Sequence, residues 1–135
     1  PEMVKKKRVI LIDDSIVRGN TSGKIVQSLF EAGAAEVHFL VSSPPVRFPD
    51  FYGIDTPEQD ELIAATHSLE EIRAFIGATS LYYLSLKNLI AATGLSQSVF
   101  NTSCFTGEYP IDIKERAAHV KRPSGEETRK LLYAT

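Results

Sequence analysis

The chain has 135 residues, and its 43% hydrophobic and 24% charged residues are typical of one globular domain with a single core. Fifteen basic and seventeen acidic side chains give a formal net charge of -2, which argues against binding nucleic acid or a membrane surface through a general positive field. We interpret the basic run over residues 5–8 as a solvated segment before a strand. The single cysteine excludes an internal disulfide, and no apolar stretch is long enough to span a bilayer, so we expect a cytoplasmic protein.

The apolar pattern of the first third of the chain predicts an α/β fold with a parallel sheet. Residues 9–12 form an unbroken β-rich apolar run, which is typical of a strand buried on both faces. Apolar residues then recur at helical spacing over residues 21–32, and Gly33 is placed to end that helix. A second apolar run over residues 37–41 completes one βαβ unit.

The remainder of the chain predicts shorter elements. After an ordered loop we expect two short helices, over residues 58–65 and 69–76, and Ser68 with Glu71 forms a capping box for the second. A strand over residues 80–84 and a helix over residues 86–92 follow, and Gly94 ends that helix. The pattern weakens from Leu95, and a last helix would be capped by Ser124 and run to Leu132. We therefore predict a boundary between residues 1–94 and a C-terminal appendage over residues 95–135.

Two adjacent carboxylates, Asp13 and Asp14, follow the first predicted strand directly. Ligands of open α/β sheets bind beyond the carboxyl ends of the strands, so these side chains could accept hydrogen bonds from two sugar hydroxyls or hold Mg2+. The next residues supply hydroxyl and amide donors, Gly19 permits a tight turn, and the following helix offers free N–H groups. The stretch therefore predicts a site for a 5-phosphoribosyl group, with the acids on the sugar and residues 15–21 around the phosphate.

Two other interpretations fit parts of this stretch. In the first, Asp13 and Asp14 only cap the turn, and the hydroxyl side chains satisfy the loop backbone. In the second, the stretch is the Asp-Asp-Ser start of a receiver domain of two-component signalling, which needs a further Asp after a later parallel strand. The strand over residues 37–41 ends in Ser-Ser-Pro-Pro instead, and Gly19 falls where the first receiver helix should already run. These two features argue against the receiver domain.

The sequence VILIDDSIVRGNTS, residues 9–22, is very similar to the phosphoribosyl-pyrophosphate motif of type I phosphoribosyltransferases, in the form found in the amidophosphoribosyltransferase family. Later segments extend this resemblance, in order, to about residue 113: SSPPVRFPDFYGID, ELIAATHSLEEIRAFIGATSLYYLSLKNLI and CFTGEYPIDI. The resemblance implies a parallel-sheet type I phosphoribosyltransferase fold, of which the chain would contain the C-terminal portion with an irregular, helical tail.

The resemblance also implies a reaction. Ammonia freed from glutamine displaces pyrophosphate from phosphoribosyl pyrophosphate, and the product 5-phosphoribosylamine commits material to purine biosynthesis. Asp13 and Asp14 would be the catalytic pair that binds the ribose hydroxyls and Mg2+. The 5′-phosphate would be bound by Ser15, Ile16, Val17, Arg18, Gly19, Asn20 and Thr21. The implied partners are an N-terminal glutaminase domain, purine nucleotides as feedback inhibitors, and further copies of the enzyme in a homo-oligomer.

Two further alternatives stay open from the sequence: a type I phosphoribosyltransferase of purine-base salvage, and a module that senses phosphoribosyl pyrophosphate or nucleotides without catalysis. The chain also departs from the iron–sulfur pattern of some family members, because Asp50, Ser98 and Asn101 stand at ligand positions and Cys104 is a lone thiol. No iron–sulfur cluster is therefore expected. Family members carry their glutaminase domain and pyrophosphate loop upstream of this region, so we expect the 135-residue chain alone to be inactive.

Overall fold

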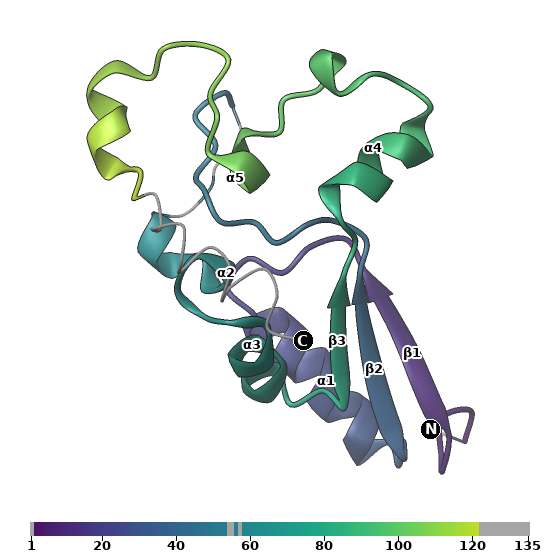
Figure 1. Cartoon of the computed structure of the whole chain (residues 1–135). Helices are drawn as coiled ribbons and strands as arrows, with labels where there is room; N and C mark the ends of the chain where they lie inside the picture. Colours follow the sequence, from purple (N-terminus) through teal and green to yellow (C-terminus); the bar gives the residue numbers. More distant parts are fainter. Residues whose placement is uncertain (1, 54–55, 57, 122–135) are drawn as a thin grey trace.

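A parallel three-stranded sheet forms the centre of the structure, a computed structural model that describes residues 2–53, 56 and 58–121. Its strands are β1 (Arg8–Asp13), β2 (Glu36–Val41) and β3 (Ser80–Tyr83), in the order β1-β2-β3. The register pairs Asp13 with Val41 and Val41 with Tyr83, so the carboxyl ends of the three strands meet at one edge (Figure 1). The predicted α/β class and all three predicted strands are confirmed.

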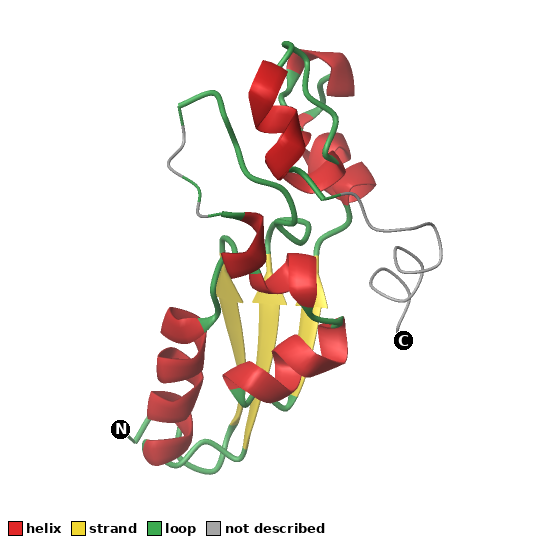
Figure 2. Cartoon of the chain, turned by 90° about the vertical axis from the view of Figure 1, so that its left-hand side faces the viewer, coloured by secondary structure: helices red, strands yellow, loops and turns green. Residues whose placement is uncertain are grey.

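Two helices, α1 (Asn20–Glu31) and α3 (Leu69–Ile76), cover the same face of this sheet (Figure 2). This arrangement follows from two successive crossovers of the same hand between neighbouring parallel strands. The core between sheet and helices is built from fully buried side chains, among them Val26, Val37, Phe39, Ile72 and Ile76. The loops at the carboxyl ends of the strands are therefore attached to a well-packed hydrophobic core.

The prediction that the first strand is buried on both faces is wrong for this structure. β1 lies at the edge of the sheet, and Ile10 and Ile12 are 65% and 68% exposed on the face that no described helix covers. Val9 and Leu11, which alternate with them, pack against the core instead. The apolar run correctly indicated a strand, but its composition did not show that only one face would be covered.

The helix predicted over residues 58–65 is replaced by two short turns, η1 (Gln59–Glu61) and α2 (Ile63–Thr66). Leu62 between them is extended, with φ −77° and ψ 109°. The N–H of Ile63 donates to the carbonyl of Val17 at 2.9 Å, so a tertiary hydrogen bond takes the place of the helical one. This contact interrupts the helix that the local pattern favours.

The helices predicted over residues 21–32, 69–76 and 86–92 are confirmed. α3 begins with the predicted capping box, in which the Ser68 and Glu71 side chains bond each other's backbone N–H groups. α4 (Leu86–Thr93) ends at Gly94, whose φ is 70°. Between Gly94 and residue 121, where the described part of the chain ends, the structure has short turns, namely η2 (Gln97–Val99), α5 (Ser103–Thr106) and η3 (Lys114–His119). The last predicted helix, to Leu132, lies outside the described residues, and no helix among those described is long and apolar enough to cross a membrane.

Candidate functional site

The two acids of the predicted site lie where β1 ends, as expected. Asp13 is the last residue of β1 and is half-buried, and one of its carboxylate oxygens accepts a hydrogen bond from the N–H of Asp14 at 3.0 Å. Asp14 is exposed, and Ser15 Oγ donates to its carboxylate at 3.3 Å. Both carboxylates keep further oxygen lone pairs for a ligand. Within the described residues no cluster of three or more His, Cys, Asp or Glu side chains is placed to hold a metal.

The loop after the acids presents unused backbone donors. Among the hydrogen bonds of the described residues, none is donated by the backbone N–H groups of residues 15–19. Gly19 is the N-cap residue of α1, with φ 79°, and no side chain caps this helix. The first N–H groups of a helix lack intrahelical partners and carry its positive dipole end. The loop and the helix start together form a cluster of donors that suits an anion.

Two residues of the loop are held by contacts with the rest of the fold. Ile16 is 1% exposed and belongs to the hydrophobic core. Val17 is half-buried, and its carbonyl accepts from the N–H of Ile63. The Ile16 side chain is therefore closed to a ligand, and its burial anchors the loop to the hydrophobic core.

Arg18 points to a partner far along the chain. Its Nη2 lies 2.9 Å from Glu61 Oε2, and the two side chains are about half exposed, at 53% and 51%. Sequence reasoning placed Arg18 at the rim of the phosphate loop but gave no indication of this partner, 43 residues away. A glutamate in a helical pattern is common, so no local signal identified Glu61.

Gly19 is enclosed by apolar side chains of the same later segment. A Cβ built on Gly19 would meet the Phe75 ring at 3.1 Å and Ile63 Cδ1 at 3.2 Å. Gly19, Asn20, Lys24 and Phe75 also line a groove of about 350 Å3 between α1 and α3. The η1–α3 segment, residues 59–76, thus contacts the loop through Glu61, Ile63 and Phe75, which the sequence analysis did not single out.

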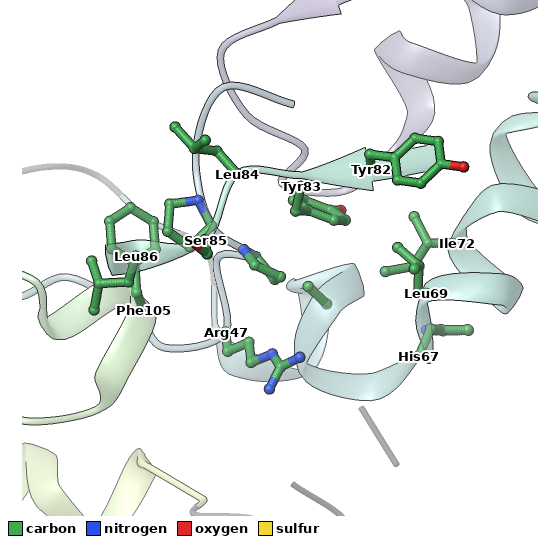
Figure 3. A pocket seen from close by; sticks show the side chains of 13 residues that line it. Arg47, His67, Leu69, Ile72, Tyr82, Tyr83, Leu84, Ser85, Leu86 and Phe105 are labelled. Atoms are coloured by element: carbon green, nitrogen blue, oxygen red, sulfur yellow. The ribbon is translucent and has the colours of Figure 1, made fainter. Parts of the chain in front are cut away.

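A second cavity, of about 470 Å3, lies at the carboxyl ends of β2 and β3, and residues 13–22 do not line it (Figure 3). Its walls are mainly apolar and include Leu69, Ile72 and Phe105. Its polar lining includes Arg47 and Tyr83, and burial lowers the pKa of the Arg47 guanidinium and raises the pKa of the Tyr83 phenol. Arg47 is 8% exposed, and its backbone N–H is held by the carbonyl of Cys104.

Asp50 and Asn101, two of the positions at which the sequence departs from the expected iron–sulfur pattern, contact each other, and neither carries a thiolate. Asn101 Nδ2 donates to Asp50 Oδ2 at 3.3 Å, and burial together with the nearby Asp50 carboxylate raises the pKa of Cys104. The carbonyl of Cys104 accepts from the N–H groups of Arg47 and Phe48, at 2.9 and 3.1 Å. These contacts hold the loop after β2 against residues 101–104.

Known proteins resemble the chain over most of its length, although no protein-family model matches it. It is 52% identical over 120 residues to the amidophosphoribosyltransferase of Synechococcus elongatus and 50% identical over 125 residues to that of Bacillus subtilis. These matches cover 89% and 88% of the chain, but 24% and 26% of the two relatives. The solved B. subtilis glutamine phosphoribosylpyrophosphate amidotransferase, complexed with ADP and GMP, matches with a TM-score of 0.79 and 50% identity over 89% of the chain and 28% of that structure.

The chain is homologous to the C-terminal part of the amidophosphoribosyltransferases. A second solved structure, an allosteric regulatory enzyme of purine biosynthesis, also matches the chain, with a TM-score of 0.79 and 46% identity over 90% of the chain. The chain spans about a quarter of the length of these amidophosphoribosyltransferases. Its parallel sheet with helices on one face corresponds to an incomplete type I phosphoribosyltransferase fold, as expected.

Proposed function

We propose that this chain forms the ribose-5-phosphate-binding part of an amidophosphoribosyltransferase. One observation carries the proposal: the unused N–H groups of residues 15–19 lead into the uncapped start of α1, directly after two carboxylates. A phosphate on the donors and a ribose on the acids would hold the two ends of one 5-phosphoribosyl group. Donors alone would suit many anions, so the adjacent Asp13 and Asp14 supply the specificity for a sugar phosphate.

The residues have distinct tasks in this proposal. Asp13 and Asp14 accept hydrogen bonds from the ribose hydroxyls, and their charge favours the positive charge that develops on the ribose as pyrophosphate leaves. Residues 15–21 hold the 5′-phosphate through backbone N–H groups and the Ser15, Asn20 and Thr21 side chains. Fixing both ends of the sugar aligns the anomeric carbon with the incoming ammonia, which is a large share of catalysis in such reactions.

The carboxylate oxygens at the end of β1 are suitable ligands for Mg2+. Mg2+ is commonly held by one or two carboxylates together with substrate phosphates and water, and Asp13 and Asp14 are the two carboxylates available here. When bound, the ion would offset negative charge on the departing pyrophosphate. The exposed Asp14 and half-buried Asp13 remain open to such a complex from the solvent side.

The wider assignment belongs to the same proposal. It comprises formation of 5-phosphoribosylamine with ammonia from a glutaminase domain, a homo-oligomeric enzyme, a cytoplasmic location and regulation by purine nucleotides. The B. subtilis enzyme was solved with ADP and GMP, and the sequence identity of about 50% favours this class over a purine-base salvage enzyme.

Replacing both acids tests the proposal. In the natural-length protein, the Asp13→Asn, Asp14→Asn variant should lower pyrophosphate release from phosphoribosyl pyrophosphate and ammonia by about 10²–10³-fold. Its circular dichroism and thermal unfolding should match the wild type, and the Asp112→Asn variant, at an exposed acid just before η3, should keep full activity. Near wild-type activity of the double variant would instead support the interpretation that the acids only cap the turn. Binding of phosphoribosyl pyrophosphate without turnover by the wild type would support the sensing module.

A further inference from the structure

The phosphate loop is supported from one side by a segment that lies more than 40 residues later in the chain. Three separate contacts join them: the Arg18–Glu61 ion pair at 2.9 Å, the Val17–Ile63 backbone hydrogen bond at 2.9 Å, and the packing of the Phe75 ring over Gly19. Each contact engages a different residue of the loop. Three consecutive loop residues are therefore held by the η1–α3 segment.

The backbone hydrogen bond determines how the loop carbonyls and N–H groups are directed. Because the carbonyl of Val17 points toward Ile63, the peptide that follows it directs the N–H of Arg18 to the opposite side. That N–H is one of the unused donors of the loop. The contact with the η1–α3 segment therefore turns a backbone donor toward the candidate phosphate site.

The ion pair places the longest side chain of the loop. Arg18 has a flexible stem, and Glu61 Oε2 holds its Nη2 at 2.9 Å on the side of the η1–α3 segment. An exposed pair of this kind adds little to the stability of the fold, typically about 0–1 kcal/mol. Its effect is on the position of the guanidinium and of the loop backbone that carries it.

The third contact is the packing of the Phe75 ring against Gly19. It is 56% exposed, which is unusual for a phenylalanine that serves only as core, and its buried edge lies against Gly19. Gly19 holds a positive φ of 79° at the start of α1, so its backbone decides how the first free N–H groups of the helix face the loop. The ring limits how far this turn can move away from the acids.

We propose that Glu61 and Phe75 are positioning residues, which hold the phosphate loop in its binding conformation through Arg18 and Gly19 without touching the substrate. This inference rests on the proposed function, since it assigns the loop to the 5′-phosphate. In this inference the hydrophobic core stabilises the fold, whereas the η1–α3 segment stabilises the conformation of the loop. Loss of either side chain raises the KM for phosphoribosyl pyrophosphate and leaves kcat and the thermal unfolding midpoint close to wild type.

A double-mutant cycle in the natural-length protein tests the role of Glu61. The Glu61→Gln variant should raise the KM for phosphoribosyl pyrophosphate about three- to five-fold, the factor that corresponds to losing an exposed ion pair. In an Arg18→Ala background the same replacement should have no further effect, because Glu61 acts through Arg18. The matched control is Glu70→Gln, which breaks the exposed Glu70–Arg73 pair in the same segment and should leave the KM unchanged.

The role of Phe75 is tested by a graded pair of replacements. The Phe75→Ala variant should raise the KM about tenfold, since it removes the stop against Gly19, whereas Phe75→Leu should restore much of the affinity. The inference is overturned if Glu61→Gln leaves the KM unchanged or lowers it, if its effect persists in the Arg18→Ala background, or if the Phe75 variants lose kcat with an unchanged KM. Failure of the wild type to bind phosphoribosyl pyrophosphate would instead overturn the proposed function itself.

Discussion

The backbone N–H of Ile63 donates a hydrogen bond of 2.9 Å to the carbonyl oxygen of Val17. This contact explains two features that local sequence does not. It interrupts the helix that residues 58–65 favour, leaving Leu62 extended, and it ties the loop after β1 to the η1–α3 segment. The candidate site is therefore formed by two parts of the chain, although its ligand-facing residues form one short stretch.

Gly19 should not tolerate a side chain. The Gly19→Ala variant combines a positive φ of 79° with contacts near 3.1 Å to the Phe75 ring, so we expect a loss of about 1–2 kcal/mol in the free energy of unfolding and weaker binding of phosphoribosyl pyrophosphate. Gly94→Ala is the matched control, because Gly94 has a φ of 70° but no atom within 4 Å of the place that a Cβ would take. Equal losses of stability and affinity in the two variants would show that the enclosure of Gly19 has no effect.

The capping box of α3 should contribute measurably to stability. The Ser68→Ala variant removes the side chain that accepts from the N–H of Glu71, and we expect it to lower the free energy of unfolding by about 1 kcal/mol in chemical denaturation. Ser96→Ala, at the short η2 turn, is a control in which little helix is lost. A smaller effect at Ser68 than at Ser96 would contradict this role.

The same box makes stability depend on pH. Hydrogen bonds from the Ser68 backbone and hydroxyl lower the pKa of Glu71 in the folded state. A lowered folded pKa means that the stabilisation is present above the unfolded pKa and is lost as the pH falls through the folded pKa. The stability difference between wild type and Glu71→Gln should therefore be present at neutral pH and shrink below about pH 4 in thermal unfolding. A difference that grows in acid would contradict this assignment.

Gln59 should fix the backbone of Lys121, the last residue that the structure describes. Its buried side-chain amide donates to the carbonyl of Lys121 at 2.8 Å and accepts from the N–H of Lys121 at 2.7 Å. The Gln59→Leu variant removes both bonds and also the one that the amide donates to the carbonyl of Arg47 at 3.1 Å, so we expect a loss of about 1–3 kcal/mol in the free energy of unfolding and faster hydrogen exchange at Lys121.

A control for Gln59 is available on the neighbouring residue. Asp60 forms an ion pair with Lys121 Nζ at 2.8 Å, but both side chains are largely exposed, at 70% and 72%. The Asp60→Asn variant should therefore change the free energy of unfolding by about 1 kcal/mol or less. If Asp60→Asn cost more than Gln59→Leu, the buried amide would not be the main anchor.

Cys104 should react slowly with alkylating reagents. Burial and the Asp50 carboxylate raise the pKa of its thiol, so little thiolate is present at neutral pH. We expect iodoacetamide to modify folded protein more slowly than protein unfolded in denaturant, and Asp50→Asn to increase the folded rate modestly. Folded and unfolded rates that are the same would show that Cys104 is freely accessible.

Sequence patterns predicted the parts of the fold that depend on neighbouring residues. The strands, the capping box at Ser68 and the stop at Gly94 each follow from a local rule, and the structure agrees with all of them. The acids and the donor loop were also found because they form one contiguous stretch between residues 13 and 21. Their role as ligands of a phosphoribosyl group remains a prediction.

What the sequence did not indicate depends on contacts between distant residues. Glu61 meets Arg18 across 43 residues, and no property of either side chain selects this partner from the other charged residues. The edge position of β1 likewise depends on which strands lie beside it, since an apolar run reads the same whether one face or both are covered. Both features required the three-dimensional arrangement.

The uncovered face of the sheet affects how the 135-residue chain behaves when it is purified on its own. Ile10 and Ile12 of β1 and Tyr82 of β3 expose apolar surface, at 65%, 68% and 61%, and the register aligns Ile12 with Tyr82 through Leu40 of β2. An exposed apolar surface of this kind favours self-association of the chain. Threonine at positions 10 and 12 would keep the β-branched shape that suits a strand while presenting hydroxyls to water, and these two replacements leave the loop after β1 unchanged.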